Sequence, residues 1–228
     1  GEEGVDRLPL KSTEVAVTIN AVIAQVKVTQ HYANEGTRPI HARYVFPAST
    51  RAAVHGMRMI IGEQVIVARI QERQAATQTF QAAKQGGKSA SLLTEERPNV
   101  FTMQVANILP GDTIRIELEY SELLVPTDGT YEFVYPAVVG PRYSTVPEAE
   151  ADDRQQWLQN PYQREGGAPA TAFAIQTHLA AGMPIAEMAC ASHQAEIVYE
   201  DSSRATVLLA AAESGGGNRD YILRYRLT

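Results

Sequence analysis

Hydrophobic and polar residues alternate along most of this chain, most clearly in residues 101–106 and 113–120. A period of two places one face of a strand on a core and the other face in water. Pro110 and Gly111 lie between the two runs. Because Pro presets φ and Gly tolerates positive φ, this pair is typical of a tight turn. We therefore expect a central hairpin, with Phe101 facing the core.

The same alternation predicts further strands on both sides of this hairpin. They are residues 14–20, 21–32, 40–46, 57–70 as two arms, 131–135, 173–179, 196–199, 204–210 and 221–227. We expect residues 21–32 and 40–46 to pair as a hairpin closed by the loop 34–39. Gly62 lies at the first central position of a two-residue turn and predicts a tight hairpin within 57–70.

One segment changes from the strand period to the helix period. In residues 71–86, Ala76, Phe80 and Ala83 follow one another at i, i+4 and i+7, which favours an amphipathic helix. A helix over an otherwise antiparallel sheet is suited to cover an edge strand. The predicted fold class is therefore mainly β, with one or more antiparallel β-sandwiches and one principal α-helix.

Residues 144–168 interrupt the alternation with an acidic, Gly- and Pro-rich stretch, which predicts a linker or surface excursion anchored locally by Trp157. The strands after it are short and alternate as half-buried strands do. About 60 residues of such strands bury too little surface to fold alone. We therefore expect residues 169–228 to pack on the N-terminal part, with strand 14–20 or a neighbour of it pairing with them.

Composition argues against several classes of partner. The 228 residues carry a formal net charge of −6, and Lys and Arg are scattered, without the basic stripe that is typical of nucleic-acid binding. No apolar run approaches the roughly 20 residues of a membrane-spanning helix, so direct membrane insertion is not expected. Cys190 is the single cysteine, which rules out a disulfide within the chain.

Candidate catalytic and metal-binding residues are few. Cys190 precedes His193 by three positions, but in a β-rich segment the pair favours a half-buried thiol beside an exposed imidazole over a nucleophile with its base. A loop near Gly36 would set His31 opposite His41, within reach of a shared metal ion. Two ligands alone bind weakly, which favours two solvent-facing histidines. We expect no catalytic residue, no metal ion and no cofactor, and a small enzyme is the least favoured hypothesis.

A series of landmarks follows in one order over residues 7–143. They are Leu8-Pro9-Leu10, 26–32 with Asn34, Pro39-Ile40, 44–47, Gly62, Phe80 with Ala83 and Gly86, Leu92-Leu93, 96–101, Asn107-Ile108, Pro110-Gly111, Pro136 and 139–143. Together they resemble the VIT domain, the vault protein and inter-alpha-trypsin inhibitor heavy-chain module. The resemblance implies a VIT β-sandwich domain over 7–143, a linker over 144–168, and a C-terminal β segment over 169–228 that leads toward a von Willebrand factor A domain.

The resemblance also implies roles for particular residues. Asp201-Ser202-Ser203 lacks the Asp-x-Ser-x-Ser spacing of an A-domain metal site, and its composition is typical of a turn. The family-motif residues are expected to be structural. They are Arg97, Pro98, Asn99, Phe101, Pro110 and Gly111. The lack of disulfide cysteines is similar to the bacterial surface relatives of this family.

These implications favour a non-enzymatic interaction and scaffold module that supports a following A domain in the same full-length chain, with host or surface proteins as further partners. The alternative is an adhesin-type sandwich that recognises protein or carbohydrate through its end loops. Exposed aromatic patches at one end would favour that alternative. Either function predicts a surface or secreted protein, located outside the cell or at the cell surface.

Overall fold

Fourteen strands and one short helix form the part of the chain that the computed structural model describes. The described residues are 10–37, 39–47, 49, 51–67, 90–97, 100–137 and 171–228, with the backbone alone for 40–45, 47, 90–97 and 100–107. The predicted helix at 71–86, the linker 144–168 and Trp157 lie outside these residues. So do the expected domain boundaries near residues 143 and 168, and the division into domains stays a prediction.

The elements are named in chain order. They are β1 (Leu10–Asn20), β2 (Ile23–Ala33), β3 (Ile40–Pro47), β4 (Ala52–Ile61), β5 (Gln64–Val67), β6 (Ala90–Arg97), β7 (Val100–Ile108), β8 (Thr113–Leu123), β9 (Thr130–Tyr135), β10 (Ala172–Ala180), β11 (Ile185–Cys190), β12 (Ala195–Tyr199), β13 (Arg204–Leu209), η2 (Ala211–Glu213) and β14 (Tyr221–Leu227). The expected strands are present, and the sequence prediction missed β6 and β11.

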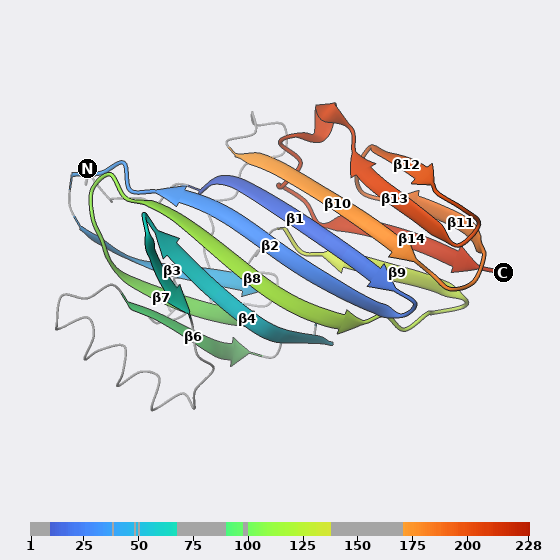
Figure 1. The fold of residues 1–228 in the computed structure, drawn as a ribbon, viewed down its shortest axis with the longest axis horizontal. Helices are drawn as coiled ribbons and strands as arrows, with labels where there is room; N and C mark the ends of the chain where they lie inside the picture. The colour runs from blue at the N-terminus through green and yellow to red at the C-terminus, as the bar shows by residue number, and fades with distance from the viewer. Residues whose placement is uncertain are drawn as a thin grey trace, which may run out of the picture.

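The strands form three open sheets (Figure 1). The large sheet has eight strands in the order β12-β13-β10-β1-β2-β8-β4-β5, and two three-stranded sheets have the orders β11-β14-β9 and β3-β7-β6. The mainly β class is confirmed. A β-sandwich is not confirmed, because the sheets do not close, and in the described part of the chain the 3-10 turn η2 is the one helix.

Strand β1 joins the two ends of the chain within the large sheet. It pairs with β2 in an antiparallel hairpin, and on its other side with β10 in parallel, from Ser12 opposite Ala172 to Asn20 opposite Ala180. This is the expected pairing of the first strand with the C-terminal set. The hairpin with β2 was not expected, and its turn contains Ala21 with a φ of 52°.

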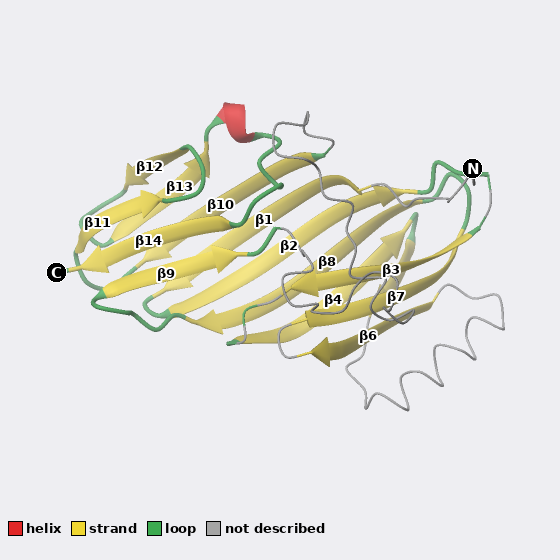
Figure 2. Ribbon diagram, turned by 180° about the vertical axis from the view of Figure 1, so that it is seen from behind, coloured by secondary structure: helices red, strands yellow, loops and turns green. Residues whose placement is uncertain are grey.

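One core lies between the large sheet and both small sheets. In Figure 2 the sheet β11-β14-β9 lies in front of β10 and β1. Tyr135 of β9 stacks on Phe173 of β10 with ring centroids 6.2 Å apart, and Phe46 of β3 packs on Tyr120 of β8 at 5.5 Å. The inward residues of β1 that alternation predicted, such as Val17, are buried in this core. N- and C-terminal strands therefore share one apolar interior.

Two expected hairpins are wrong. Strands β7 and β8 follow each other in sequence, but β7 pairs with β3 and β6 while β8 pairs with β2 and β4. Strands β2 and β3 likewise belong to different sheets. Alternation indicates which face of a strand is buried but does not specify which strand it pairs with. The short connections β2–β3 and β7–β8 were therefore predicted to be hairpin turns, whereas each carries the chain from one sheet to another.

Asn34, in the connection between β2 and β3, hydrogen-bonds to residues around the connection between β7 and β8. Its backbone N–H donates to the carbonyl of Asp112 (2.9 Å), and its carbonyl accepts from the N–H of Gly111 (2.9 Å). Its side-chain amide donates to the carbonyl of Ile108 (3.1 Å). Gly111 has a φ of +83°, which only glycine adopts at low cost. The family landmarks Asn34 and Gly111 therefore meet at one corner.

Candidate functional site

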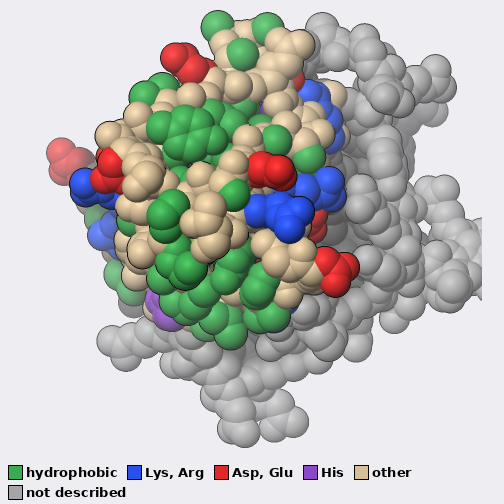
Figure 3. Space-filling view, turned by 90° about the vertical axis from the view of Figure 1, so that its right-hand side faces the viewer, with side chains coloured by type: hydrophobic (Ala, Val, Ile, Leu, Met, Phe, Trp, Pro, Cys, Tyr) green, Lys and Arg blue, Asp and Glu red, His purple; other side chains and the backbone are tan. Residues whose placement is uncertain are grey.

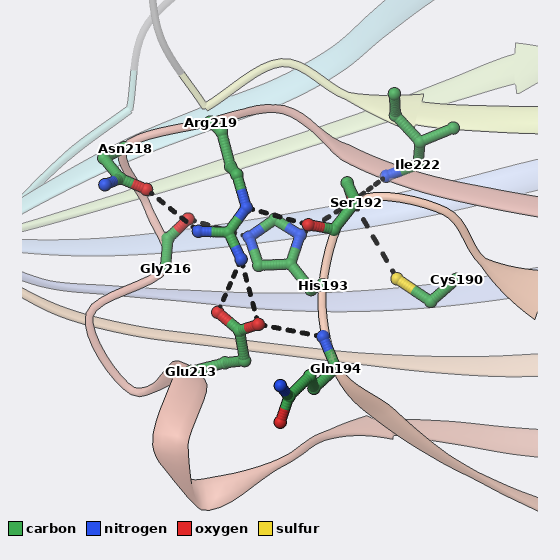
Figure 4. A network of polar contacts seen from close by, with 9 residues as sticks. All are labelled: Cys190, Ser192, His193, Gln194, Glu213, Gly216, Asn218, Arg219 and Ile222. Carbon is green, nitrogen blue, oxygen red and sulfur yellow. Dashed lines mark hydrogen bonds and ion pairs between the residues drawn. The ribbon is translucent and has the colours of Figure 1, made fainter. Parts of the chain in front are cut away.

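A network of polar contacts surrounds His193, in the loop between β11 and β12 (Figure 4). Its Nδ1 lies 2.7 Å from Ser192 Oγ, and its Nε2 lies 2.8 Å from the carbonyl oxygen of Gly216. Gly216 belongs to the connection that leads from η2 to β14. The imidazole therefore joins two loops that are more than twenty residues apart in sequence.

The hydrogen-bond partners fix which nitrogen of His193 carries the proton. A carbonyl oxygen can only accept, so Nε2 carries the hydrogen and donates it to Gly216. In the neutral ring Nδ1 then accepts from the hydroxyl of Ser192, and the oxygen of that hydroxyl accepts from the backbone N–H of Ile222 at 2.8 Å. Both ring nitrogens are therefore engaged with the protein itself.

The imidazole is buried, so the expectation of an exposed His193 is wrong. The residue is 6% exposed, and its ring packs against those of Phe173 and Tyr221, with centroids 6.2 and 6.0 Å away. No local pattern predicts this burial of His193, because the loop 191–194 does not alternate and both rings come from distant strands. Cys190 is half-buried as expected, with its sulfur 3.8 Å from Ser192 Oγ.

A salt bridge between Glu213 and Arg219 also holds the loop between β11 and β12 in place. Arg219 donates through Nη2 to both carboxylate oxygens of Glu213 (2.9 and 2.7 Å) and through Nε to the carbonyl of Ser192 (2.8 Å). The backbone N–H of Gln194 also donates to Glu213 (2.8 Å). That N–H and the Arg219 guanidinium lower the pKa of Glu213, because they stabilise the carboxylate.

This network is suited to holding loops and not to hydrolysis. A serine nucleophile needs a base with a free lone pair that can take the hydroxyl proton and pass it on to a leaving group. In the network, Nε2 faces a carbonyl and the Ser192 hydroxyl is held by Ile222. The pair Ser192–His193 therefore has the distance of a catalytic dyad, but its imidazole is only 6% exposed and both ring nitrogens already bond groups of the protein.

The family-motif residues that the structure describes lie at two separate places in the fold. Arg97 ends β6 and Phe101 lies near the start of β7, where the backbone of Arg97 pairs with that of Val100. Pro110 and Gly111 lie beyond the far end of β7. Pro98 and Asn99 are outside the described residues, and the six residues stay a structural prediction.

The other candidates do not form a metal site. His31 lies opposite Arg115 of β8, and His41 lies in β3 of another sheet, so the two are not cross-strand neighbours. In the part of the chain with described side chains, no cluster of three or more His, Cys, Asp or Glu residues could hold a metal ion. Likewise, no described helix has the length and apolar character needed to cross a membrane.

Asp201-Ser202-Ser203 forms the predicted turn, between β12 and β13. The Asp201 carboxylate accepts from the N–H (2.8 Å) and the hydroxyl (3.0 Å) of Ser203 and from Arg204 Nε (2.7 Å). The Ser203 N–H, followed by Arg204, lowers the pKa of Asp201 to about 2. The carboxylate therefore serves to stabilise the turn through these hydrogen bonds.

Apolar side chains are exposed at the end of the molecule where β14 finishes. Ile23 and Leu123 are cross-strand partners, Val125 follows Leu123, and Met183 lies in the β10–β11 loop. These four residues, which we call the end patch, are 39 to 51% exposed. Figure 3 shows hydrophobic side chains gathering on this end. The sequence prediction missed the patch, although Leu123 and Val125 extend the run of β8 into a loop.

Comparison with known proteins shows which proteins this chain resembles. Residues 10–120 match the family model of the vault protein inter-alpha-trypsin domain, VIT. Von Willebrand factor A domain-containing protein 5A from Rattus norvegicus is 28% identical over 97% of this chain, which covers 27% of that protein. Protein mono-ADP-ribosyltransferase PARP4 from Homo sapiens is 34% identical over 59% of this chain and 8% of that protein. Inter-alpha-trypsin inhibitor heavy chain H2 from Homo sapiens is 24% identical over 57% of this chain and 14% of that protein.

These matches correct one expectation and support another. The relatives are mammalian, with a further one from Dictyostelium discoideum, and they do not support the expected bacterial origin. The chain spans about a quarter of the relative that matches nearly all of it, and that relative's name states that it contains a von Willebrand factor A domain. In that relative, the segment that resembles this chain therefore occurs in the same protein as an A domain.

Proposed function

We propose that this chain is the VIT module of a longer protein, a non-enzymatic interaction and scaffold module that supports a following von Willebrand factor A domain. The VIT match over residues 10–120 and the names of the relatives support this. In this proposal the layered sheets act as a β-sandwich scaffold, residues 144–168 are the linker, and residues 169–228 lead to the A domain.

The position of the end patch carries the proposal. Strand β14 lies between β11 and β9, and the N–H of Thr228, the residue after β14, donates to the carbonyl of Pro184 at 3.0 Å. Met183 of the end patch immediately precedes Pro184. An A domain that follows β14 would therefore start beside exposed apolar surface, and burying that surface would hold the two domains in one orientation.

Hydrogen–deuterium exchange tests this on the natural protein that contains this chain and its A domain. Compared with residues 1–228 alone, we expect slower exchange in the natural protein around the β1–β2 turn, at Leu123–Val125 and near Met183. Leu123→Asp should remove that protection, because it places a charge in the buried interface. Val67→Asp changes an exposed apolar residue of β5 and serves as the matched control. Equal exchange in the two proteins would refute the proposal.

The alternative, an adhesin-type module, has one observation in its favour. Tyr199, at the end of β12, is 52% exposed, so an aromatic side chain is available at a loop-bearing edge. Exposed aromatic rings are common contacts for carbohydrates and proteins. Under this alternative, Tyr199→Ala would abolish binding to a glycan or protein array while leaving domain protection unchanged. A location outside the cell or at its surface stays a prediction, which immunofluorescence on unpermeabilised cells would test.

A further inference from the structure

A pocket of about 270 Å³ lies between Ser49 and Arg51, the end of β8 and strand β9. Its walls include Ser49, Arg51, Glu122, Thr127, Thr130 and Glu132. A water molecule occupies about 30 Å³ in the liquid, so the pocket has room for more than one bridging water. Its lining is polar, unlike the aromatic core a few residues away.

Glu122 is the buried acidic residue in the lining of this pocket. On β8 it shares a face with Tyr120 and Leu118, because residues two apart point to the same side of a strand. The residue is 5% exposed. Ser49 supplies a side-chain hydrogen bond, while Oε2 has no hydrogen-bond partner. A buried carboxylate oxygen without a partner is uncommon in folded proteins, because its lost hydration is not replaced.

The charges around the pocket indicate which kind of ligand group Glu122 Oε2 would bind. Glu132 is already paired with Arg224, at 2.7 Å. Arg51 is exposed and favours the charged form of Glu122, but it does not bond Oε2. An anion entering near Arg51 would also meet two carboxylates. The group that fits beside Glu122 Oε2 is therefore a hydrogen-bond donor. A positively charged donor forms the strongest hydrogen bond to a carboxylate.

We propose that this pocket binds one ammonium or guanidinium group, either of a small amine or of a lysine or arginine side chain. The cation donates to Glu122 Oε2, and the threonine-lined walls accommodate the alkyl chain behind it. Burial raises the pKa of Glu122, and a bound cation opposes that shift by stabilising the carboxylate. The proposal does not depend on the A domain, and it can fail or succeed independently of the proposed function.

Nuclear magnetic resonance of the ¹⁵N-labelled chain tests the site directly. Titration with n-butylammonium chloride at constant ionic strength should give saturable shifts at the amides of Thr127 and Thr130, and n-butanol, the neutral control, should not. Glu122→Gln keeps the shape and removes the charge, and it should weaken binding by about tenfold or more. Glu119→Gln, on the exposed face of the same strand, should change it by less than about twofold.

Two further arms complete the test. Tighter binding of Nα-acetyl-lysine amide than of n-butylammonium indicates a polypeptide side chain as the ligand, and the reverse order indicates a free amine. On the unmodified chain, binding should weaken as the pH falls, because protonation of Glu122 removes the acceptor charge while Arg51 stays charged; burial raises the pKa of Glu122, so this loss should begin at a higher pH than for an exposed glutamate. Absence of saturable shifts, equal binding of n-butanol, or unchanged affinity in Glu122→Gln overturns the proposal.

Discussion

Gly216 passes so close to His193 that a larger residue does not fit without displacement. A Cβ at this position would lie 2.8 Å from His193 Cδ2 and 3.0 Å from the carbonyl oxygen of Glu213. The ring is buried against Phe173 and Tyr221, which leaves it little room to move aside. Gly216→Ala should lower the free energy of unfolding by about 1–3 kcal/mol, the usual cost of overpacking. Urea unfolding measures this loss.

Gly56 is the matched control for that substitution. It lies in β4, and a Cβ there would meet no heavy atom within 4 Å. Gly56→Ala should be neutral or slightly stabilising, since alanine has less backbone freedom to lose on folding. If the two variants unfold at the same urea concentration, the packing around His193 is looser than described.

The Glu213 carboxylate predicts a pH dependence of stability. Its pKa lies below the ordinary value of 4.5, first because of the Gln194 N–H and then because of Arg219. A lowered pKa in the folded state contributes stability above the unfolded value, and this is lost as the pH falls through the folded value. Glu213→Gln should therefore reduce the loss of stability below about pH 4.5, measured by urea unfolding at several pH values.

Glu119→Gln is the control for the loss of one carboxylate. Glu119 is exposed on the outer face of β8, with Lys27 at 3.7 Å. If Glu119→Gln flattens the acid limb as much as Glu213→Gln does, the effect comes from net charge and not from the loop network.

At the scale of elements, alternation predicted faces well and partners poorly. Val15, Val17 and Ile19 are buried as their period of two indicates, and so are Phe173, Ile175 and Leu179. The partner of a strand depends on contacts far away in sequence. Asn34 is one such contact, because it fixes the corner at which β7 and β8 separate into two sheets. A local pattern holds no information about that corner.

The candidate site was the least predictable part for the same reason. Ser192 and His193 are adjacent, but the groups that determine their chemistry are Gly216 and Ile222, which lie more than twenty residues later. The predicted run stopped at residue 120, whereas β8 continues to Leu123 and its alternation places Glu122 inward, two positions after Tyr120. Following the period to the end of the strand would have identified it.

The parallel pair β1–β10 makes the C-terminal strands necessary for the large sheet. A chain that ends at Ala168 would lack β10 and leave β1 with an unpaired edge from Ser12 to Asn20. It would also uncover the apolar face that β9 and β14 close together. We expect this shorter chain to melt at a lower temperature than residues 1–228, or to aggregate through its open edge.

Calorimetry and size-exclusion chromatography of the shorter chain measure this effect. A fragment 1–168 that stays monomeric and melts at the same temperature as the whole chain would show that the pairing with β10 contributes nothing to stability.

At the scale of the whole molecule, the shared core predicts a single cooperative unit. Tyr221 of β14 and Thr177 of β10 are in contact (3.3 Å between hydroxyls), and β10 continues through β1 into β2. Amide exchange in β2 and in β14 should therefore report the same opening free energy, because neither strand can leave without exposing the other's core.

Native-state hydrogen exchange in low urea checks this prediction. Opening free energies that differ clearly between β2 and β14, with β14 lower, would show that the C-terminal strands unfold as a separate unit.

The distance in sequence between β1 and β10 also has a consequence during synthesis. Ser12 pairs with Ala172, so the ribosome adds 160 residues (172 minus 12) before the outer edge of β1 can be covered. At about 5–20 residues per second this takes roughly 8–30 seconds. Over that interval the nascent chain presents an apolar strand edge to its surroundings. Its yield in cells should therefore depend on chaperones that shield the N-terminal strands until the last quarter of the chain emerges.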